Sequence, residues 1–353
     1  MITDIFSRRY EKTILRDQYY LEDRRLFNQM AAMTTDILWN GSKSDTISDF
    51  SEQNLKEVHD ILALEIGQEF LSNRWWFHTS TYNGNTVQTS HKNSYASICK
   101  SFLTAEPKDV SQGDIWVKER LSFVELAFQR RFLQITDMNR NLPAELARAQ
   151  SDDSAQQLMR ALRIPGSQVA GVQARVERLT AAFEALVRDL SERFRLAKYD
   201  LAFHNGLIQF VSDDQTHTQV EKPFWSLVAG QPWTNVDTQM KEAIDRRDNG
   251  DRTAAFHAVS AVESCIKIIS DTKGWTHGKE KGAASYVDNL ASRQNGNFID
   301  QWEAETLKRM FSDVRNPFAH GPGLAPMPTL TSAQTDWTID TAMSWIKSLR
   351  RRM

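Results

Sequence analysis

The chain has 353 residues, 41% hydrophobic and 25% charged, a composition typical of soluble globular proteins and a length sufficient for two or three domains. Its formal net charge of −2 excludes a global attraction to nucleic acid, so any RNA site must be a local patch. The two cysteines, Cys99 and Cys265, stand in separate segments and support neither a disulfide framework nor a thiolate metal site. Because no run approaches about 18 apolar residues and the charged start lacks the apolar core of a signal peptide, we expect a cytoplasmic protein that does not enter a membrane.

The first part of the chain predicts helices around one irregular segment. Apolar residues recur at helical spacing in 19–33, 51–70 and 115–137. Residues 73–98 break this spacing and contain an Asn-Gly turn signal within 82–85, followed by a run rich in Thr, Ser and Gln. This segment predicts either a hairpin or a loop.

The middle of the chain contains the main domain boundary. A second long helix is predicted at 168–199, and a short extended piece follows at 207–211. Proline and glycine are frequent in 222–233, which is typical of a junction. We therefore place the boundary near residue 230, between an N-terminal domain at 1–230 and a C-terminal domain at 235–353.

The C-terminal domain predicts a compact helical module. Helical patterns cover 236–248, 251–273, 283–290, 301–314 and 332–352. A loop rich in glycine and lysine, 274–282, connects the second pattern to the third. The fold class predicted for the whole chain is mainly α, a helical N-terminal domain with a small hairpin followed by a C-terminal helical bundle.

The most informative motif is Arg315-Asn316-Pro317-Phe318-Ala319-His320-Gly321, at the end of an amphipathic helix. It places a guanidinium, an amide and an imidazole within one or two helical turns. Arginine binds phosphate bidentately and histidine transfers protons near neutral pH. These are the groups needed to cleave an RNA backbone without a metal ion.

The spacing within the motif needs a distorted helix to bring its ends together. Positions five apart in a regular helix lie about 140° around the axis. Pro317 predicts a kink or a restart of the helix with Asn316 as the new cap, which would bring Arg315 and His320 to one cleft. The alternative is structural: Arg315 pairs with a neighbour such as Asp313, and His320 packs at the helix end.

The spacing alone is weak evidence. A second arginine and histidine five positions apart occur at Arg252 and His257. The context of the Arg315 motif, with Asn316 directly after the arginine and Gly321 after the histidine, sets it apart from this second pair.

With this motif, residues 235–353 resemble HEPN domains, whose signature is an arginine followed by a polar residue and then by histidine four to six positions on. The whole chain also looks like the abortive-infection AbiJ family. The segments that carry this likeness are Ile5–Arg9, Glu119–Phe128, Phe203–Gly206, Asn235–Asp237 and Ala261–Glu263. The resemblance implies a four- or five-helix bundle that pairs as a dimer, and a metal-independent endoribonuclease that acts as a toxin in phage defence.

The reaction implied is attack of a ribose 2′-OH on the adjacent phosphate, which gives a 2′,3′-cyclic phosphate and a 5′-OH. His320 would act as general base or acid, and Arg315 would stabilise the charge of the phosphorane. Asn316 would orient the histidine or the phosphate. Because the reaction needs both a base and an acid, a two-fold dimer with two facing motifs would complete the site.

Two further features of the C-terminal domain are candidates for the site. Glu263 either pairs with Arg315 and presets its geometry or pairs with Lys267 one turn along the helix. The loop after the second helix is either a site for RNA, combining backbone binding with base stacking, or a solvated connector. Its candidate RNA-binding residues are Lys273, Trp275, His277, Lys279 and Lys281.

The predicted function is thus an endoribonuclease effector with RNA as substrate, which forms a homodimer or a higher homo-oligomer through its HEPN domain. We expect no metal and no cofactor. The N-terminal domain would sense or regulate, with a trigger derived from phage or from nucleic acid. The first alternative is a catalytically inactive HEPN module for dimerisation or for binding a nucleotide or RNA. A DNA- or RNA-binding regulator has little support, because the charge is balanced and no recognition helix is evident.

Overall fold

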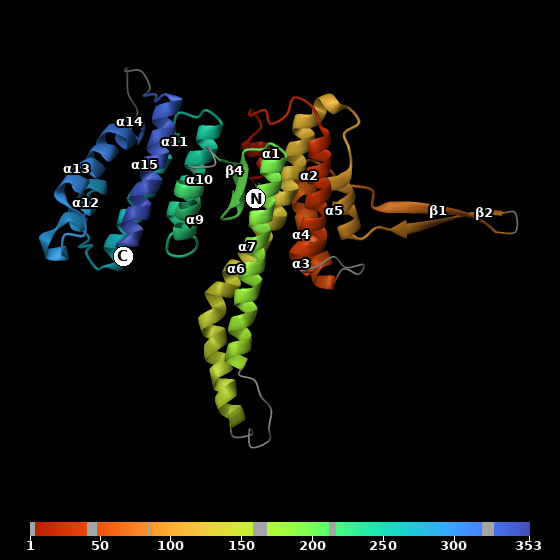
Figure 1. Ribbon diagram of the computed structural model, residues 1–353, viewed down its shortest axis with the longest axis horizontal. Coiled ribbons are helices and arrows are strands. Elements are labelled where there is room, and N and C mark those ends of the chain that lie inside the picture. Colours follow the sequence, from red (N-terminus) through yellow and green to blue (C-terminus); the bar gives the residue numbers. More distant parts are fainter. Residues whose placement is uncertain (1–3, 41–47, 83–84, 158–167, 212–216, 320–327) are drawn as a thin grey trace. The chain divides into compact units, whose positions relative to one another are not determined.

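The computed structural model describes residues 4–40, 48–82, 85–157, 168–211, 217–319 and 328–353. The described residues are mainly helical and include two antiparallel hairpins, which confirms the predicted fold class (Figure 1). The chain divides into two compact units, residues 1–208 and residues 209–353. Each unit buries its own set of large apolar side chains.

The first unit consists of helices and the two hairpins. Its helical segments are α1 (Phe6–Arg9), α2 (Leu21–Ala31), the π-helix η1 (Ala32–Ile37), α3 (Leu38–Asn40), α4 (Asp49–Glu65), α5 (Tyr95–Thr104), the 3₁₀ turn η2 (Val110–Gln112), α6 (Gly113–Gln157) and α7 (Gln168–Leu196). Its strands are β1 (Trp75–Tyr82), β2 (Asn85–Lys92), β3 (Leu201–His204) and β4 (Leu207–Phe210), and the division between the units falls inside β4.

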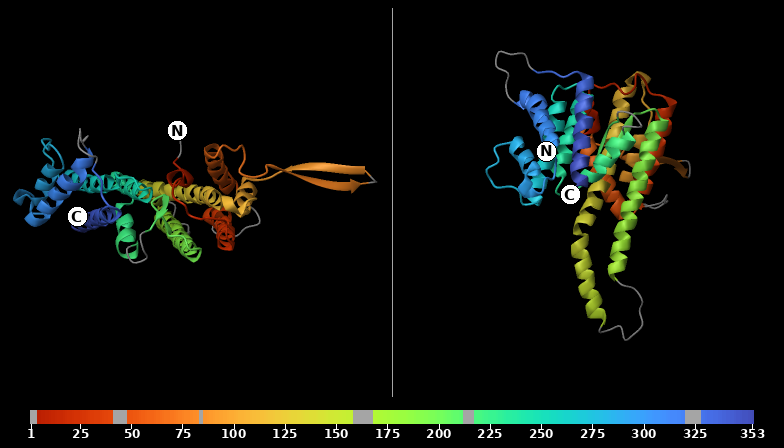
Figure 2. Two further views of the ribbon diagram at one scale, coloured as in Figure 1. Left: turned by 90° about the horizontal axis from the view of Figure 1, so that it is seen from above. Right: turned by 60° about the vertical axis from the view of Figure 1, so that its left-hand side comes forward.

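The helix predicted at 115–137 is part of α6, which continues past Pro143 and lies antiparallel beside α7 (Figures 1 and 2). The predicted apolar stripe is buried at Val117, Leu121, Val124 and Phe128. Three charged side chains of the same helix are also buried, namely Lys118, Arg120 and Glu125. The helix is therefore enclosed on several sides, and each buried charge needs a partner.

Within residues 73–98, the strands β1 and β2 form a hairpin, and helix α5 begins at Tyr95. β1 pairs with β2 from Trp75 opposite Lys92 to Tyr82 opposite Asn85. The Asn-Gly dipeptide between the strands lies outside the described residues, but this dipeptide is the strongest short-range signal for a two-residue hairpin turn. The strands extend away from the helices of the first unit (Figure 1).

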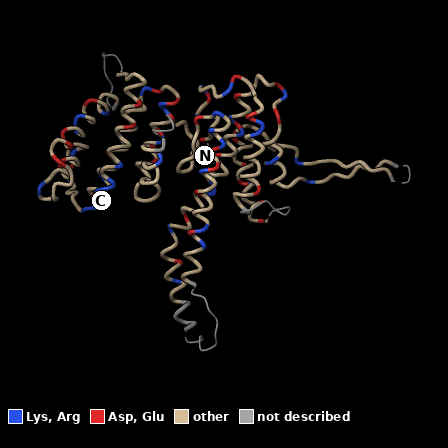
Figure 3. Tube along the Cα trace, in the orientation of Figure 1, with Lys and Arg blue, Asp and Glu red and all other residues tan. Residues whose placement is uncertain are grey.

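The second unit is helical apart from the end of β4. Its segments are the π-helix η4 (His217–Glu221), α9 (Lys222–Val228), α10 (Thr234–Asp248), α11 (Ala254–Thr272), α12 (Ala283–Ala291), the 3₁₀ turn η5 (Arg293–Asn295), α13 (Gln301–Arg309), the π-helix η6 (Met310–Arg315), α14 (Asn316–Ala319) and α15 (Ser332–Arg351). Acidic and basic residues are interspersed along these helices (Figure 3).

Helix α11 forms the centre of the second unit. It packs against α10, α12, α15 and η6. Its apolar residues Val259, Val262, Ile266 and Ile269 are all fully buried. Neighbouring helices begin at sequence-encoded caps: Thr331 and Gln334 form a capping box at the start of α15. This packing fixes the side chains that α11 presents to η6.

The segment 222–233 is not a linker between the compact units. It forms α9, with Pro223 in the first turn, where proline is tolerated because that N–H needs no helical partner. Phe224 and Trp225 of α9 and Trp233 beyond it are buried in the core of the second unit. The compact units consequently divide after Ile208, ahead of the predicted boundary near 230.

Candidate functional site

Glu263 of α11 lies between two cations of the second unit. Its Oε2 is 2.8 Å from Nη2 of Arg315 on η6, and its Oε1 is 2.8 Å from Nζ of Lys267. Both partners predicted for this carboxylate therefore bind it, one at each oxygen. Asp313, the alternative partner considered for Arg315, instead accepts a hydrogen bond from Ser312. The position of the Arg315 guanidinium is set by α11.

The Arg315 guanidinium retains donors that the protein does not use. Its Nε is buried and has no hydrogen-bond partner among the described residues. The side chain is 27% exposed, while that of Glu263 is 9% exposed. Its Cζ lies 6.0 Å from the ring centroid of Phe256, one apolar wall of the site. A guanidinium held on one side with donors remaining is suited to bind an anion.

The helix that carries the motif is not interrupted at Pro317. It is helical from Gln301 to Ala319, with a π-helical stretch at Met310–Arg315 directly before α14. Asn316 has helical dihedrals (φ −61°, ψ −38°) and is exposed, so the predicted restart with Asn316 as cap is wrong. In a regular α-helix the proline ring would clash with the carbonyl of Asp313, and the wider π-turns change the carbonyl positions before it.

His320 lies outside the described residues. Its distance from Arg315 and its role in proton transfer therefore stay predictions. The same holds for the catalytic role of Asn316, whose side chain makes no polar contact in the described part of the chain. The structure does show one of the two predicted partners of Glu263, since Arg315 and Glu263 form an ion pair.

The loop that follows α11 is separate from this ion pair. Lys273 stands ten residues beyond Glu263, which is roughly 15 Å along the helix axis. Trp275 is half-buried and packs edge-to-face on Phe298, with centroids 5.7 Å apart, so its ring is committed to the core. This packing argues against the predicted base-stacking role of Trp275.

The remaining candidates in the loop are exposed. Lys273, Lys279, Lys281 and His277 all face solvent, and none of the three lysines has an ion pair among the residues described. Glu280 among them accepts a hydrogen bond from the backbone N–H of His277, which lowers the pKa of Glu280 to about 2. The loop therefore offers cations for a phosphate backbone around one carboxylate that stays ionised.

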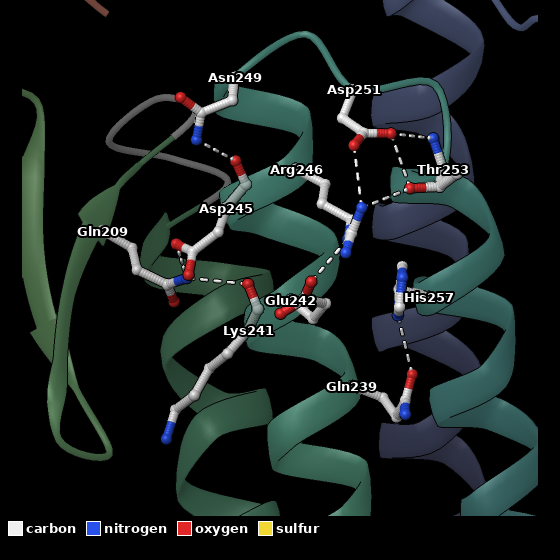
Figure 4. Close-up of polar contacts among 10 residues, drawn as sticks. All are labelled: Gln209, Gln239, Lys241, Glu242, Asp245, Arg246, Asn249, Asp251, Thr253 and His257. Atoms are coloured by element: carbon white, nitrogen blue, oxygen red, sulfur yellow. Dashed lines mark hydrogen bonds and ion pairs between the residues drawn. The ribbon is translucent and has the colours of Figure 1, made fainter. Parts of the chain in front are cut away.

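The second arginine and histidine pair does not resemble the first. His257 points toward α10, where its Nδ1 lies 3.1 Å from Oε1 of Gln239, as Figure 4 shows. Burial lowers the pKa of His257, and the charge of Arg246 adds to this effect. Six residues separate His257 from Glu263, which places the two about 120° apart around α11. His257 thus belongs to a polar contact between α10 and α11, away from the Glu263 face.

Sequence reasoning missed a buried ion pair in the first unit. Arg9 of α1 binds Glu125 of α6 through two contacts of 2.9 and 2.6 Å. The backbone of Ile208 completes the group, since its N–H donates to Glu125 and its carbonyl accepts from Arg9. The only signal in the sequence was that Arg9 and Glu125 lie in segments that carry the family resemblance.

The described residues contain neither a long apolar helix nor a cluster of metal-binding side chains. No helix there has the length and apolar content needed to cross a bilayer. In the same residues, no group of three or more His, Cys, Asp and Glu side chains is placed to hold a metal ion.

Comparison with known proteins identifies the N-terminal part of the chain. A family model described as AbiJ N-terminal domain 4 matches residues 4–226. No curated protein and no solved structure matches the chain. The matched region includes the Arg9–Glu125 pair and ends in α9, before Glu263 and Arg315.

Proposed function

The chain belongs to the AbiJ N-terminal domain 4 family, and from this premise we propose that it is an abortive-infection effector that cleaves RNA without a metal ion. The first unit and the start of the second carry the family match. The cleavage site is assigned to the second unit, at Arg315 and His320. Its resemblance to HEPN domains supports this assignment.

The observation that carries the proposal is the Glu263–Arg315 ion pair. Glu263 fixes the guanidinium, and the exposed part of the Arg315 side chain would donate to the non-bridging oxygens of a phosphate. As the 2′-oxygen attacks phosphorus, the phosphorane gains negative charge, and a preorganised guanidinium stabilises that charge more than it stabilises the substrate.

Proton transfer is assigned to His320. As general base, it takes the proton of the 2′-OH while the new P–O2′ bond forms. The P–O5′ bond breaks, and the leaving oxygen takes a proton from a general acid, which leaves a 2′,3′-cyclic phosphate and a 5′-OH. The acid would be the same motif in a second copy of the chain, so the proposed enzyme is a two-fold homodimer. Lys273, Lys279 and Lys281 would bind the RNA backbone at a distance from the reacting phosphate.

One observation favours a second candidate function, an inactive HEPN module that binds a nucleotide or RNA or mediates dimerisation. The two ion pairs that Glu263 makes, with Lys267 and with Arg315, connect η6 to α11. Such a group of charges can serve the packing of helices alone. Under this alternative, substitution of Arg315 would lower the stability of the protein, and there would be no catalytic activity for it to change.

Toxicity on expression separates the two functions. We expect induced wild-type protein to arrest bacterial growth, and the Arg315→Ala and His320→Ala variants to lose this effect while folded protein accumulates to wild-type levels. Circular dichroism of each purified variant checks the fold. If both variants arrest growth as strongly as wild type, the ribonuclease proposal is wrong.

A further inference from the structure

The hairpin β1–β2 exposes aromatic side chains on both of its faces. Trp75, Trp76 and Phe77 are 51%, 48% and 61% exposed. A two-stranded ribbon without a covering layer is marginally stable in water, and exposed aromatic rings do not stabilise it unless something packs on them. The ribbon therefore has the character of a binding surface, which its role in the fold of the first unit does not explain.

One face of the ribbon combines two rings with a cation. Alternation along β1 places Trp75 and Phe77 on the same face, and the register puts Lys92 directly opposite Trp75. Lys92 is exposed, and no ion pair is found for it within the described ranges. Side chains from Ser and Gln continue this face along β2.

The opposite face has a different set of rings. Trp76 stacks on His91 of β2, with centroids 4.4 Å apart and planes 18° apart. His78 lies 6.4 Å from the Trp76 ring on the same face. The indole and imidazole of the stacked pair are both exposed, so they form a flat aromatic platform on this face.

The ribbon carries positive charge and no negative charge. No Asp or Glu occurs in residues 73–94, although the chain has 45 acidic residues in all, and Figure 3 shows no acidic position on either strand. Arg74 lies at the base of β1, where its Cζ is 4.5 Å from the ring of Tyr95. The ribbon thus presents rings, hydroxyl groups and positive charge, with no carboxylate to repel a phosphate.

Rings beside cations on an open surface are how proteins bind unpaired nucleic acid, because every base has a face for stacking and every linkage a phosphate. We propose that the ribbon β1–β2 binds single-stranded RNA. Bases stack on Trp75, Trp76 and Phe77, and Lys92 pairs with the backbone. The choice of RNA rests on the proposed function, and the ribbon would present substrate or trigger RNA to the chain. A copy of the ribbon itself is a poorer partner, since it brings the same positive charge.

Binding is tested in the full-length His320→Ala background, so that cleavage does not affect the readout. A fluorescein-labelled 20-nucleotide oligouridine is titrated with protein, and anisotropy gives the Kd. We expect the ribbon triple variant, Trp75→Ala with Trp76→Ala and Phe77→Ala, to bind at least tenfold more weakly, since each stacked base contributes about 1–3 kcal/mol. Lys92→Gln should lose a few-fold and reduce the salt slope by about one.

The matched control replaces two exposed tryptophans of the second unit. Trp302 and Trp337 are 63% and 61% exposed, and a Trp302→Ala, Trp337→Ala variant should bind RNA within twofold of the parent. Circular dichroism checks that the ribbon variant keeps its helices.

Three results would overturn the inference. Equal RNA binding by the ribbon variant and the parent would show that the ribbon is not the site. A change in oligomeric state on light scattering, with RNA binding unchanged, would make the ribbon a contact between copies. Equal or tighter binding of oligothymidine DNA would refute the choice of RNA. If the ribbon binds RNA but wild-type protein never cleaves it, only the ribonuclease proposal falls.

Discussion

Two arginine–glutamate pairs, one in each unit, differ in how far they are exposed to solvent. The side chains of Arg9 and Glu125 are 4% and 1% exposed, and both also bond to the backbone of Ile208. Arg315 and Glu263 are 27% and 9% exposed, and Glu263 also binds Lys267. The residue types are the same and the surroundings are not.

This difference separates a structural pair from a candidate catalytic one. A fully buried ion pair is closed to solvent, so a ligand cannot reach it. A partly exposed guanidinium that is held by one carboxylate keeps donors for a phosphate. The account therefore predicts that the first pair determines stability and the second determines activity.

The largest effect is expected for Arg9→Ala. Removing one partner leaves Glu125 buried and unpaired, which should lower the free energy of unfolding by about 3–5 kcal/mol. Urea denaturation followed by circular dichroism measures it. The control is the neighbouring Arg8→Ala, whose pair with Glu65 is 44% exposed on the arginine side and should contribute less than about 1 kcal/mol. Equal losses in the two variants would contradict the structural role of Arg9.

Arg315→Lys should affect activity more than stability. Lysine keeps the charge beside Glu263 but loses the planar fork that binds two phosphate oxygens. We expect the initial rate of RNA cleavage to fall about 100-fold, with a change in unfolding free energy below about 1 kcal/mol. A variant that loses stability and keeps its rate would assign Arg315 to packing alone.

Glu263→Gln tests a positioning residue. The amide is isosteric but no longer holds the guanidinium by charge, so we expect kcat to fall about tenfold while KM for RNA stays close to wild type. Glu305→Gln, at an exposed carboxylate on α13, is the matched control and should leave kcat unchanged. A rise in KM with unchanged kcat would show that Glu263 affects RNA binding and not the orientation of Arg315.

A third pair, Arg352 with Glu303, has the most exposed arginine of the three and gives the smallest effect. It is bidentate at 2.9 and 2.6 Å, with side chains 36% and 5% exposed. Arg352→Ala should cost about 1 kcal/mol at pH 7. The hydrogen bond from Arg352 lowers the pKa of Glu303, so this stability is present above the ordinary glutamate pKa and is lost as the pH falls through the lowered value. Unfolding of both proteins at several pH values checks this; a difference that persists at low pH would contradict the ion pair.

Local sequence patterns correctly predicted those helices and turns whose structure depends mainly on their own residues. The helix predicted at 115–137 lies within α6, and the turn signal at 82–85 correctly indicated a hairpin. The segment 222–233 was misinterpreted because proline and glycine are typical of linkers, whereas its tryptophans join the second core. Long-range packing, which no local pattern encodes, decided that case.

The candidate site was predicted in part, for the same reason. Arg315 and Glu263 are 52 positions apart, so helical spacing predicted only the contact of Glu263 with Lys267. Pairing with Arg315 was the other option, and the structure has both. The polar loop around Trp275 predicted that its ring stacks on RNA bases, but Phe298 from a later segment packs against it. The π-helix before Pro317 was also not predictable from proline rules that assume a regular α-helix.

The most direct test of the central claim is RNA cleavage by purified protein in EDTA, with total and transfer RNA as substrates and analysis of the product ends. The account predicts that wild type leaves 2′,3′-cyclic phosphates and 5′-hydroxyls, and that His320→Ala leaves the RNA intact. RNA that stays intact with wild type, or that is cut equally by His320→Ala, would contradict it.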